Sequence, residues 1–316
     1  MLTGLLALVA LPALSQEAYP SRPIRLVVPY APGGVSDITG RIVAQKMTEL
    51  LGQAMVVENR AGAGGMVGTG SVAKSAPDGY TIVLSSLSAY AIGPRLVRAP
   101  LYDPIADFTP IAAVALAPTI LTINTALPFK SLKELIAFGK ANPGKLTYGS
   151  SGIGSVAHIS AEMLRASTGI ELVHVPYKSA AQAYPDMFSG SVSMVFDALP
   201  SAIQYIKSGK VRPIAMMSDR RASLLPDVPT FAEAGYPEAT LRLWVGLHGP
   251  AGLPAPIVQK LNDTAARAVA APDVRERFTA VGADAYSVSP REFADLVRAD
   301  VERLGKMMAD AGIKGE

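Results

Sequence analysis

The sequence predicts an α/β protein of two lobes, each a sheet flanked by helices, with a hinge between the lobes. Three observations lead to this prediction: strands alternate with helices along the chain, the strands are continuously apolar, and two proline-rich stretches interrupt the series. Continuously apolar strands are typical of sheets that helices cover on both faces. With 316 residues, the chain is long enough for two domains.

The first strand and helix follow directly after residue 22. Residues 24–30 form an apolar strand, and a turn containing proline and glycine leads into a helix predicted over residues 36–52. One face of this helix is apolar, formed by Ile38, Ile42, Val43, Met47 and Leu50. Gly52 ends the helix.

The same alternation continues along most of the chain. Strands are predicted over residues 54–59, 80–86, 120–125, 145–151, 171–177, 191–198 and 211–218. Helices are predicted over residues 67–76, 131–142, 155–168, 180–190, 199–209, 255–271, 273–282 and 290–312. Residues 241–254, with the last three helices, are expected to complete the first lobe.

The proline-rich stretches, residues 98–118 and 224–238, predict where one lobe gives way to the other. The first lobe is expected to contain residues 16–119 and 228–316, and the second lobe residues 120–227. Two crossings between the lobes would form a hinge. Three consecutive small units are the alternative.

Residues 1–15 have the pattern of a secretory signal peptide. The first charged residue is Glu17, and the apolar run is too short to span a bilayer. Small residues, Ala13 and Ser15, precede a predicted cleavage site before Gln16. We therefore expect export to the periplasm; a buried N-terminal strand or helix is the alternative.

The composition excludes several classes of site. The absence of cysteine excludes disulfides, iron–sulfur clusters, thiolate zinc sites and cysteine nucleophiles. A net charge of +3 without a basic run gives no electrostatic footprint for nucleic acid. The histidines, His158, His174 and His248, do not have helical metal-ligand spacing, so we expect no metal site and interpret each as a packing or hydrogen-bonding residue.

Four loops rich in glycine or serine follow predicted strands and open predicted helices: residues 31–37, 59–68, 85–93 and 149–155. Unpaired N–H groups and the helix dipole favour an anion there, such as a carboxylate or a phosphate. For any single loop, turn glycines and helix N-caps at Ser36 and Ser155 explain the pattern equally well. Four such loops in one chain favour a ligand crevice at the carboxyl ends of the strands.

Enzyme signatures are weak. Gly62, Gly64 and Gly68 are similar to a dinucleotide-binding fingerprint, but the next strand does not end in the acidic residue that would bind a ribose. Ile153 stands where a G-x-S-x-G nucleophile motif needs its last glycine. We therefore expect a non-catalytic protein without a cofactor, with an NAD(P)-linked oxidoreductase as the alternative.

Six segments in order resemble the substrate-binding receptors of tripartite tricarboxylate transporters, the Bug family of periplasmic solute receptors. They are residues 22–44, 56–84, 102–112, 148–164, 174–197 and 225–254, the last with a gap at residues 239–242. The resemblance implies a type II periplasmic-binding-protein fold, whose two lobes close on a small carboxylated solute. It also implies membrane components of a tripartite transporter as partners, and we expect a monomer. A ligand sensor that signals without feeding transport is a further alternative.

The resemblance also implies the ligand-binding residues. In the first lobe these are Pro32, Gly33, Gly34, Ser36, Asp37, Ser85 and Ser88; in the second they are Ser150, Ser151, Gly154, Ser155, His158, Tyr177 and Asp197. Residues 150–155 would hold a carboxylate at a helix start, and Asp197 would border the pocket. The chain departs from the family at Ser179, where a glycine is usual, and at Tyr184-Pro185, which interrupts the predicted helix.

Overall fold

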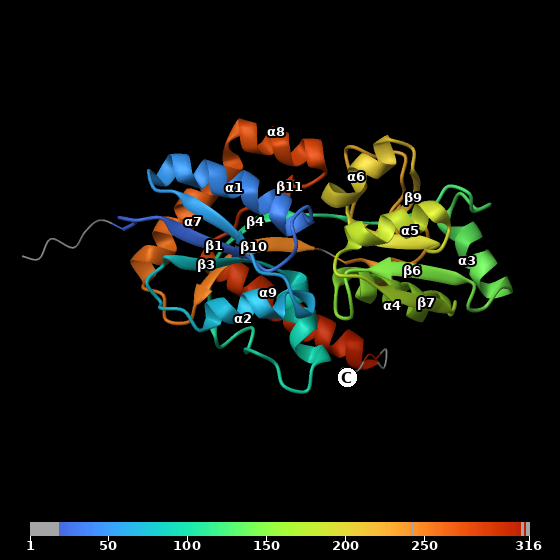
Figure 1. Ribbon diagram of the computed structural model, residues 1–316, viewed down its shortest axis with the longest axis horizontal. Helices are drawn as coiled ribbons and strands as arrows, with labels where there is room; N and C mark the ends of the chain where they lie inside the picture. Colours follow the sequence, from blue (N-terminus) through green and yellow to red (C-terminus); the bar gives the residue numbers. More distant parts are fainter. Residues whose placement is uncertain (1–18, 242, 311–312, 314–316) are drawn as a thin grey trace, which may run out of the picture.

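A computed structural model describes residues 19–241, 243–310 and 313. Two sheets lie side by side, each with helices on both faces (Figure 1). The architecture is therefore the two-lobed α/β fold that the sequence predicts. None of the helices in the described ranges combines the length and apolar character that a membrane span requires.

The first sheet has six strands in the order β11-β4-β10-β3-β1-β2. Strands β1, β2 and β3 are parallel, whereas β10 runs antiparallel to β3 and to β4. The strand bounds are β1 Ile24–Val28, β2 Met55–Asn59, β3 Thr81–Ser86, β4 Phe108–Leu116, β10 Trp244–Pro250 and β11 Asp284–Ala285. Strand β4 lies inside the proline-rich stretch that the sequence analysis interpreted only as a boundary.

Helices cover both faces of this sheet (Figure 1). In β1, Leu26 and Val28 pack in the cluster with α1 and α7, whereas Val27 packs in the cluster with α2 and α9. The helix bounds are α1 Val35–Leu51, α2 Met66–Ala73, α7 Ala255–Ala270, α8 Pro272–Val281 and α9 Pro290–Asp310. Short helical turns are η1 Ala63–Gly65, η2 Ser88–Ile92 and η3 Gly93–Leu96. Because both faces are buried, the strands are continuously apolar.

The second sheet has five strands in the order β7-β6-β8-β5-β9. Strand β6 is parallel to β7 and β8, and β5 is antiparallel to β8 and β9. The strand bounds are β5 Thr119–Asn124, β6 Leu146–Ser150, β7 Leu172–Pro176, β8 Met194–Ala198 and β9 Val211–Met216. The helix bounds are α3 Leu132–Ala141, α4 Val156–Thr168, η4 Ala180–Gln182, α5 Ala183–Ser189, α6 Leu199–Lys207 and η5 Pro237–Ala239.

Helix α5 corrects one expectation about the departures from the family pattern. Pro185 lies in its first turn, where a missing N–H group costs no hydrogen bond, so the proline does not interrupt the helix. Ser179 has φ −152° and ψ 155°, an extended conformation that needs no glycine. Both residues therefore fit the local backbone without strain.

The chain passes between the two sheets twice. The first passage joins β4 to β5 directly, and the second joins β9 to β10. The two passages lie side by side, because the Ala117 N–H group donates to the Leu243 carbonyl oxygen at 2.8 Å. Residues 228–240, which the sequence analysis assigned to the first lobe, run partly beside the second sheet, where Thr230 forms a parallel bridge with Met216.

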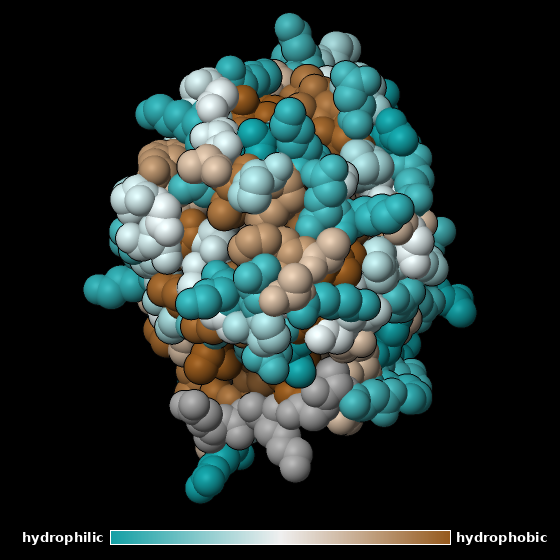
Figure 2. Space-filling view, turned by 90° about the vertical axis from the view of Figure 1, so that its right-hand side faces the viewer, coloured by the Kyte–Doolittle hydropathy of each residue, from teal (hydrophilic) through white to brown (hydrophobic). Residues whose placement is uncertain are grey.

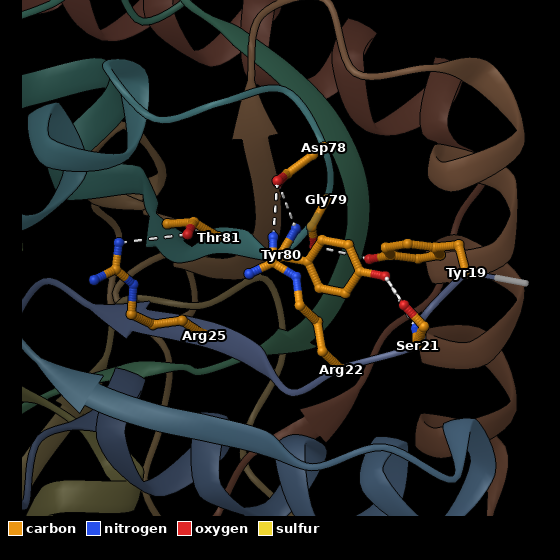
Figure 3. Close-up of polar contacts among 8 residues, drawn as sticks. All are labelled: Tyr19, Ser21, Arg22, Arg25, Asp78, Gly79, Tyr80 and Thr81. Carbon is orange, nitrogen blue, oxygen red and sulfur yellow. Dashed lines mark hydrogen bonds and ion pairs between the residues drawn. The ribbon is translucent and has the colours of Figure 1, made fainter. Parts of the chain in front are cut away.

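The beginning of the described chain is tied to the loop before β3 (Figure 3). The Tyr19 hydroxyl donates to the Gly79 carbonyl oxygen at 2.8 Å, and Arg22 pairs with Asp78 at 3.1 Å. The Arg22 guanidinium also lies 4.1 Å from the centre of the Tyr80 ring. The predicted signal peptide and its cleavage site before Gln16 lie outside the described residues.

Hydrophilic side chains cover much of the outer end of the second lobe, and apolar side chains are scattered among them (Figure 2). This mixture is normal for a surface in contact with water.

Candidate functional site

A cavity of about 110 Å³ lies between the two sheets. Residues from both lobes line it. The lining residues are Tyr30, Ala31, Gly33, Gly34, Val35, Ser36, Ser86, Ser88, Thr119, Ser151, Val156, Ala157, Lys178, Ser179, Ala180, Ala181, Phe196, Asp197, Ala198, Ser201 and Leu243. A ligand held here would therefore contact both lobes at once.

Three helices begin at this cavity. The lining includes the N-cap and first two residues of α1, the first two residues of α4, and the N-cap and third residue of α6. First-turn N–H groups have no partner within their own helix, and the helix dipole places partial positive charge at the same end. In α6 the Leu199 N–H group already donates to the Pro118 carbonyl oxygen and Pro200 has no N–H group, so this helix offers mainly the N–H group of Ser201. Helix N-termini from both lobes thus converge on one small volume, which favours an anion.

Two buried hydroxyls in the lining have no hydrogen-bond partner among the described residues. They are Ser36 Oγ, on a residue that is 1% exposed, and Thr119 Oγ1, on a residue that is 0% exposed. A buried polar group left unpaired costs about 1–3 kcal/mol. Both hydroxyls are therefore free to hydrogen-bond a ligand or an ordered water.

Asp197, at the end of β8, is the carboxylate among the lining residues. The Ala198 N–H group donates to its Oδ1 at 2.8 Å, and the Tyr184 hydroxyl donates to its Oδ2 at 3.3 Å. Burial raises the pKa of Asp197 to about 7, although these two hydrogen bonds partly oppose the effect. At neutral pH the carboxyl group is therefore divided between its protonated and ionised forms.

The two lobes touch beside the cavity. The Ser88 hydroxyl, in the first lobe, donates to the Gly154 carbonyl oxygen, in the second lobe, at 3.0 Å. A side chain at Gly154 would also meet Leu96 of the first lobe, with 2.6 Å between the added Cβ atom and Leu96 Cδ1. The lobes are therefore in direct contact on this side of the cavity.

The cavity brings together six of the residues that the sequence analysis proposed for ligand binding: Gly33, Gly34, Ser36, Ser88, Ser151 and Asp197. The other proposed residues, Pro32, Asp37, Ser85, Ser150, Gly154, Ser155, His158 and Tyr177, do not line it. Several of these other residues have clear structural roles instead.

Asp37 holds the loop before α1. It accepts hydrogen bonds from the Gly33 N–H group at 3.1 Å, from Arg41 Nε at 2.9 Å and from Asn59 Nδ2 at 3.0 Å. Desolvation raises the pKa of Asp37, but these hydrogen bonds outweigh it and hold the pKa below its usual value. The Gly33 N–H group is thus already used within the protein, although Gly33 itself lines the cavity.

Ser155 caps α4, as one of the two explanations predicted: its hydroxyl accepts from the His158 N–H group at 3.2 Å. The corresponding prediction for Ser36 is wrong, because Gly34 is the N-cap of α1. The N-cap of α1 lies two residues before Ser36, and the Ser36 hydroxyl is left without a capping role.

The histidines of the second lobe support the loop at residues 150–155. The rings of His158 and His174 stack with centroids 4.6 Å apart, and His174 Nε2 lies 2.6 Å from Ser150 Oγ. Burial lowers the pKa of His158, and burial together with His158 lowers that of His174 to about 4. Both rings are therefore neutral at pH 7 and act as packing and hydrogen-bonding groups.

Ser85 and Tyr177 also bond away from the cavity. The Ser85 hydroxyl donates to the Gly246 carbonyl oxygen at 2.9 Å and lies 2.6 Å from His248 Nδ1, inside the first lobe. The Tyr177 hydroxyl donates to Asp186. His248 is fully buried, and burial lowers its pKa to about 3.

Several cavity residues were missed from the sequence: Tyr30, Ser86, Thr119, Lys178 and Ser201. Ser86 follows Ser85 in β3, and adjacent strand residues point to opposite faces, so choosing between them requires the orientation of the strand. The Tyr30 hydroxyl lies 2.7 Å from Ser86 Oγ, which links two of the missed residues.

A second cleft, of about 370 Å³, lies on another side of the hinge. Its arginines are engaged: Arg220 pairs with Asp284 at 3.0 Å, and Arg221 pairs with Glu233 at 2.9 Å. Although this cleft is larger, it lacks the converging helix N-termini and the unpartnered hydroxyls. The cavity between the lobes is therefore the stronger candidate for a ligand site.

The glycines of the dinucleotide-like loop, Gly62, Gly64 and Gly68, do not line the cavity. A side chain at Gly68 would lie 2.5 Å from the Arg60 carbonyl oxygen. This glycine therefore allows close packing of α2 against the chain beside it.

The sequence matches one family of receptors over nearly its whole length. The sequence profile of the tripartite tricarboxylate transporter family receptor matches residues 39–313. Protein BugT of Bordetella pertussis is 36% identical over 302 residues, which cover 95% of this chain and 93% of BugT.

Solved structures are similar over nearly the whole chain. The R. palustris protein Rpa4515, solved with adipate, has a TM-score of 0.90 and 34% identity, covering 94% of this chain and 100% of that one. MatC from Rhodopseudomonas palustris, solved with malate, has a TM-score of 0.85 and 33% identity, covering 91% of this chain and 99% of that one.

Proposed function

The chain belongs to the tripartite tricarboxylate transporter receptor family, and from this premise we propose that it binds one small carboxylated solute in the cavity between its lobes. It is a receptor and not an oxidoreductase. The observation that carries the proposal is the convergence of the first turns of α1, α4 and α6 on one cavity. The carboxylates bound by the adipate and malate complexes of two relatives agree with this anion site.

The bound solute is delivered to the membrane components of a tripartite transporter. The receptor acts in the periplasm as a monomer, after removal of a signal peptide before Gln16. The contacts of Tyr19 and Arg22 with residues 78–80 agree with this cleavage site, because Tyr19, three residues after Gln16, is hydrogen-bonded into the first lobe and would remain in the mature protein. N-terminal sequencing of periplasmic protein tests the site, and an uncleaved chain in the cytoplasm would contradict it.

A thermal-shift screen tests ligand binding. Small mono- and dicarboxylates are compared with their amides, which have the same shape without the charge. A ligand at 100 times its Kd should stabilise the protein by about 2.7 kcal/mol. We expect acids to raise the Tm and amides to leave it unchanged; equal shifts would contradict an anion site.

A further inference from the structure

We propose that the solute carries a hydrogen-bond donor, a hydroxyl or an ammonium group, in addition to its carboxylate, and that Asp197 binds this donor. The inference rests on the proposed function, namely that the cavity binds a carboxylate. It concerns the part of the solute that the helix N-termini do not bind.

The cavity lining is chemically asymmetric. The helix N-termini and Lys178 offer N–H donors, whereas Asp197 offers carboxylate oxygens. A solute that presented only carboxylates and methylene groups would bring like charge towards the ionised form of Asp197 without giving it a hydrogen-bond donor. A hydroxyl or ammonium group would instead donate to it.

Asp197 has free capacity to accept a hydrogen bond. A carboxylate has about four acceptor positions, and the described residues provide one short bond, from the Ala198 N–H group, and one long bond of 3.3 Å, from Tyr184. Asp197 forms no ion pair with a described residue. A donor on the ligand would therefore satisfy a carboxyl group that the protein leaves only partly bonded.

The two unpartnered hydroxyls extend this polar region. Ser36 Oγ and Thr119 Oγ1 belong to different lobes, and both residues line the same cavity as Asp197. A hydroxyl both donates and accepts, so each can bond a polar group on the solute. A purely apolar extension of the solute would leave both hydroxyls without a partner.

Two matched series of acids test the inference. Succinate, malate and aspartate share one carbon skeleton and differ at one carbon, which carries hydrogen, hydroxyl or ammonium. Propionate, lactate and alanine form the same series with one carboxylate. In calorimetric titrations, we expect malate or aspartate, or their shorter counterparts, to bind at least tenfold more tightly than the unsubstituted acid. Tighter binding of malate than of aspartate would identify the donor as a hydroxyl group, and the reverse would identify it as an ammonium group.

Asp197→Asn should reduce this preference to less than threefold, because the variant weakens binding of the donor-bearing acid and removes the like charge that the unsubstituted acid meets. Ser36→Ala should weaken binding of the donor-bearing acid. Ser160→Ala is its matched control, because Ser160 is also in a helix, is 0% exposed and has an unpartnered hydroxyl, but does not line the cavity. The control should leave the affinity unchanged.

The outcomes separate this inference from the proposed function. Equal binding of all three members of a series overturns the inference and leaves the carboxylate receptor standing. A preference that persists in Asp197→Asn overturns the role of Asp197. If no acid of either series binds, both proposals fail. The comparison within the wild-type protein needs no variant, so poor folding of Asp197→Asn would not prevent the test.

Discussion

Serines around the cleft have different roles that residue type alone does not reveal. Ser155 caps a helix, Ser150 pairs with His174, Ser88 joins the lobes, and Ser36 has no partner. The family resemblance placed all four near a ligand. Only the directions of their side chains distinguish those that support loops from those that face the cavity, and direction depends on how the helices and strands pack.

Ser155→Ala should therefore change stability more than binding. The loss of an N-cap hydrogen bond costs about 1 kcal/mol, and Ser155 does not line the cavity. We expect the free energy of unfolding to fall by about that amount, with ligand affinity within about threefold of wild type. Denaturant unfolding and calorimetric titration measure the two quantities. A more than tenfold loss of affinity would show that Ser155 contacts the ligand.

Asp197 should make the stability of the ligand-free protein depend on pH. The folded-state pKa of Asp197, about 7, is above its usual value. Its contribution to the free energy of unfolding is therefore greatest at low pH and is lost as the pH rises through about 7. His174 and His248, with pKa values lowered to about 4 and about 3, act in the opposite direction as the pH falls below 6.5. The wild-type curve alone would therefore mix the effect of Asp197 with that of the histidines.

The difference between Asp197→Asn and wild type isolates Asp197, because the histidines are present in both proteins. We expect the variant to become more stable relative to wild type on going from pH 5 to pH 8. Urea unfolding at the two pH values gives the two differences. If the difference in free energy is the same at both, burial does not raise the pKa of Asp197.

At the scale of elements, the sequence predicted most strands and helices because apolar periodicity is local. Strand β4 was missed because its residues 108–116 follow several prolines, whereas its place is set by antiparallel pairing with β10, more than 120 residues away. A local sequence pattern cannot predict pairing between strands that are so far apart in the chain. The same holds for the site: the glycine-rich loops could be predicted, but Thr119 and Lys178 required the arrangement of both sheets.

Gly65, at the junction of η1 and α2, should be essential for the position of Tyr30. Its φ is +97°, and an added Cβ atom would lie 2.9 Å from the Tyr30 ring and hydroxyl. Gly52 is a matched control, with φ +69° and no atom within 4 Å of an added Cβ. Both Gly→Ala changes cost about 1–2 kcal/mol for the left-handed backbone.

Gly65→Ala should cost more stability than Gly52→Ala and should also weaken ligand binding, because Tyr30 lines the cavity. Gly52→Ala should leave affinity unchanged. Unfolding and titration of both variants make the comparison. Equal losses of stability with wild-type affinity in both would show that Tyr30 can move without consequence.

At the scale of the whole molecule, the site exists only because the two lobes meet. Helices α1, α4 and α6 belong to two sheets, and the chain segments that join these sheets lie together at Ala117 and Leu243. Closure brings their N-termini to one cavity and allows the Ser88–Gly154 hydrogen bond to form between the lobes. A solute bound there is held by both lobes, so its release requires the lobes to separate.

A crystal structure of the protein with the acid that binds most tightly tests the central claim most directly. We expect the ligand carboxylate in the cavity between the lobes, within hydrogen-bond reach of first-turn N–H groups of α1, α4 or α6, directly or through one water. A carboxylate bound instead in the second cleft, beside Arg220 and Arg221, with the cavity between the lobes holding no solute, would contradict the account.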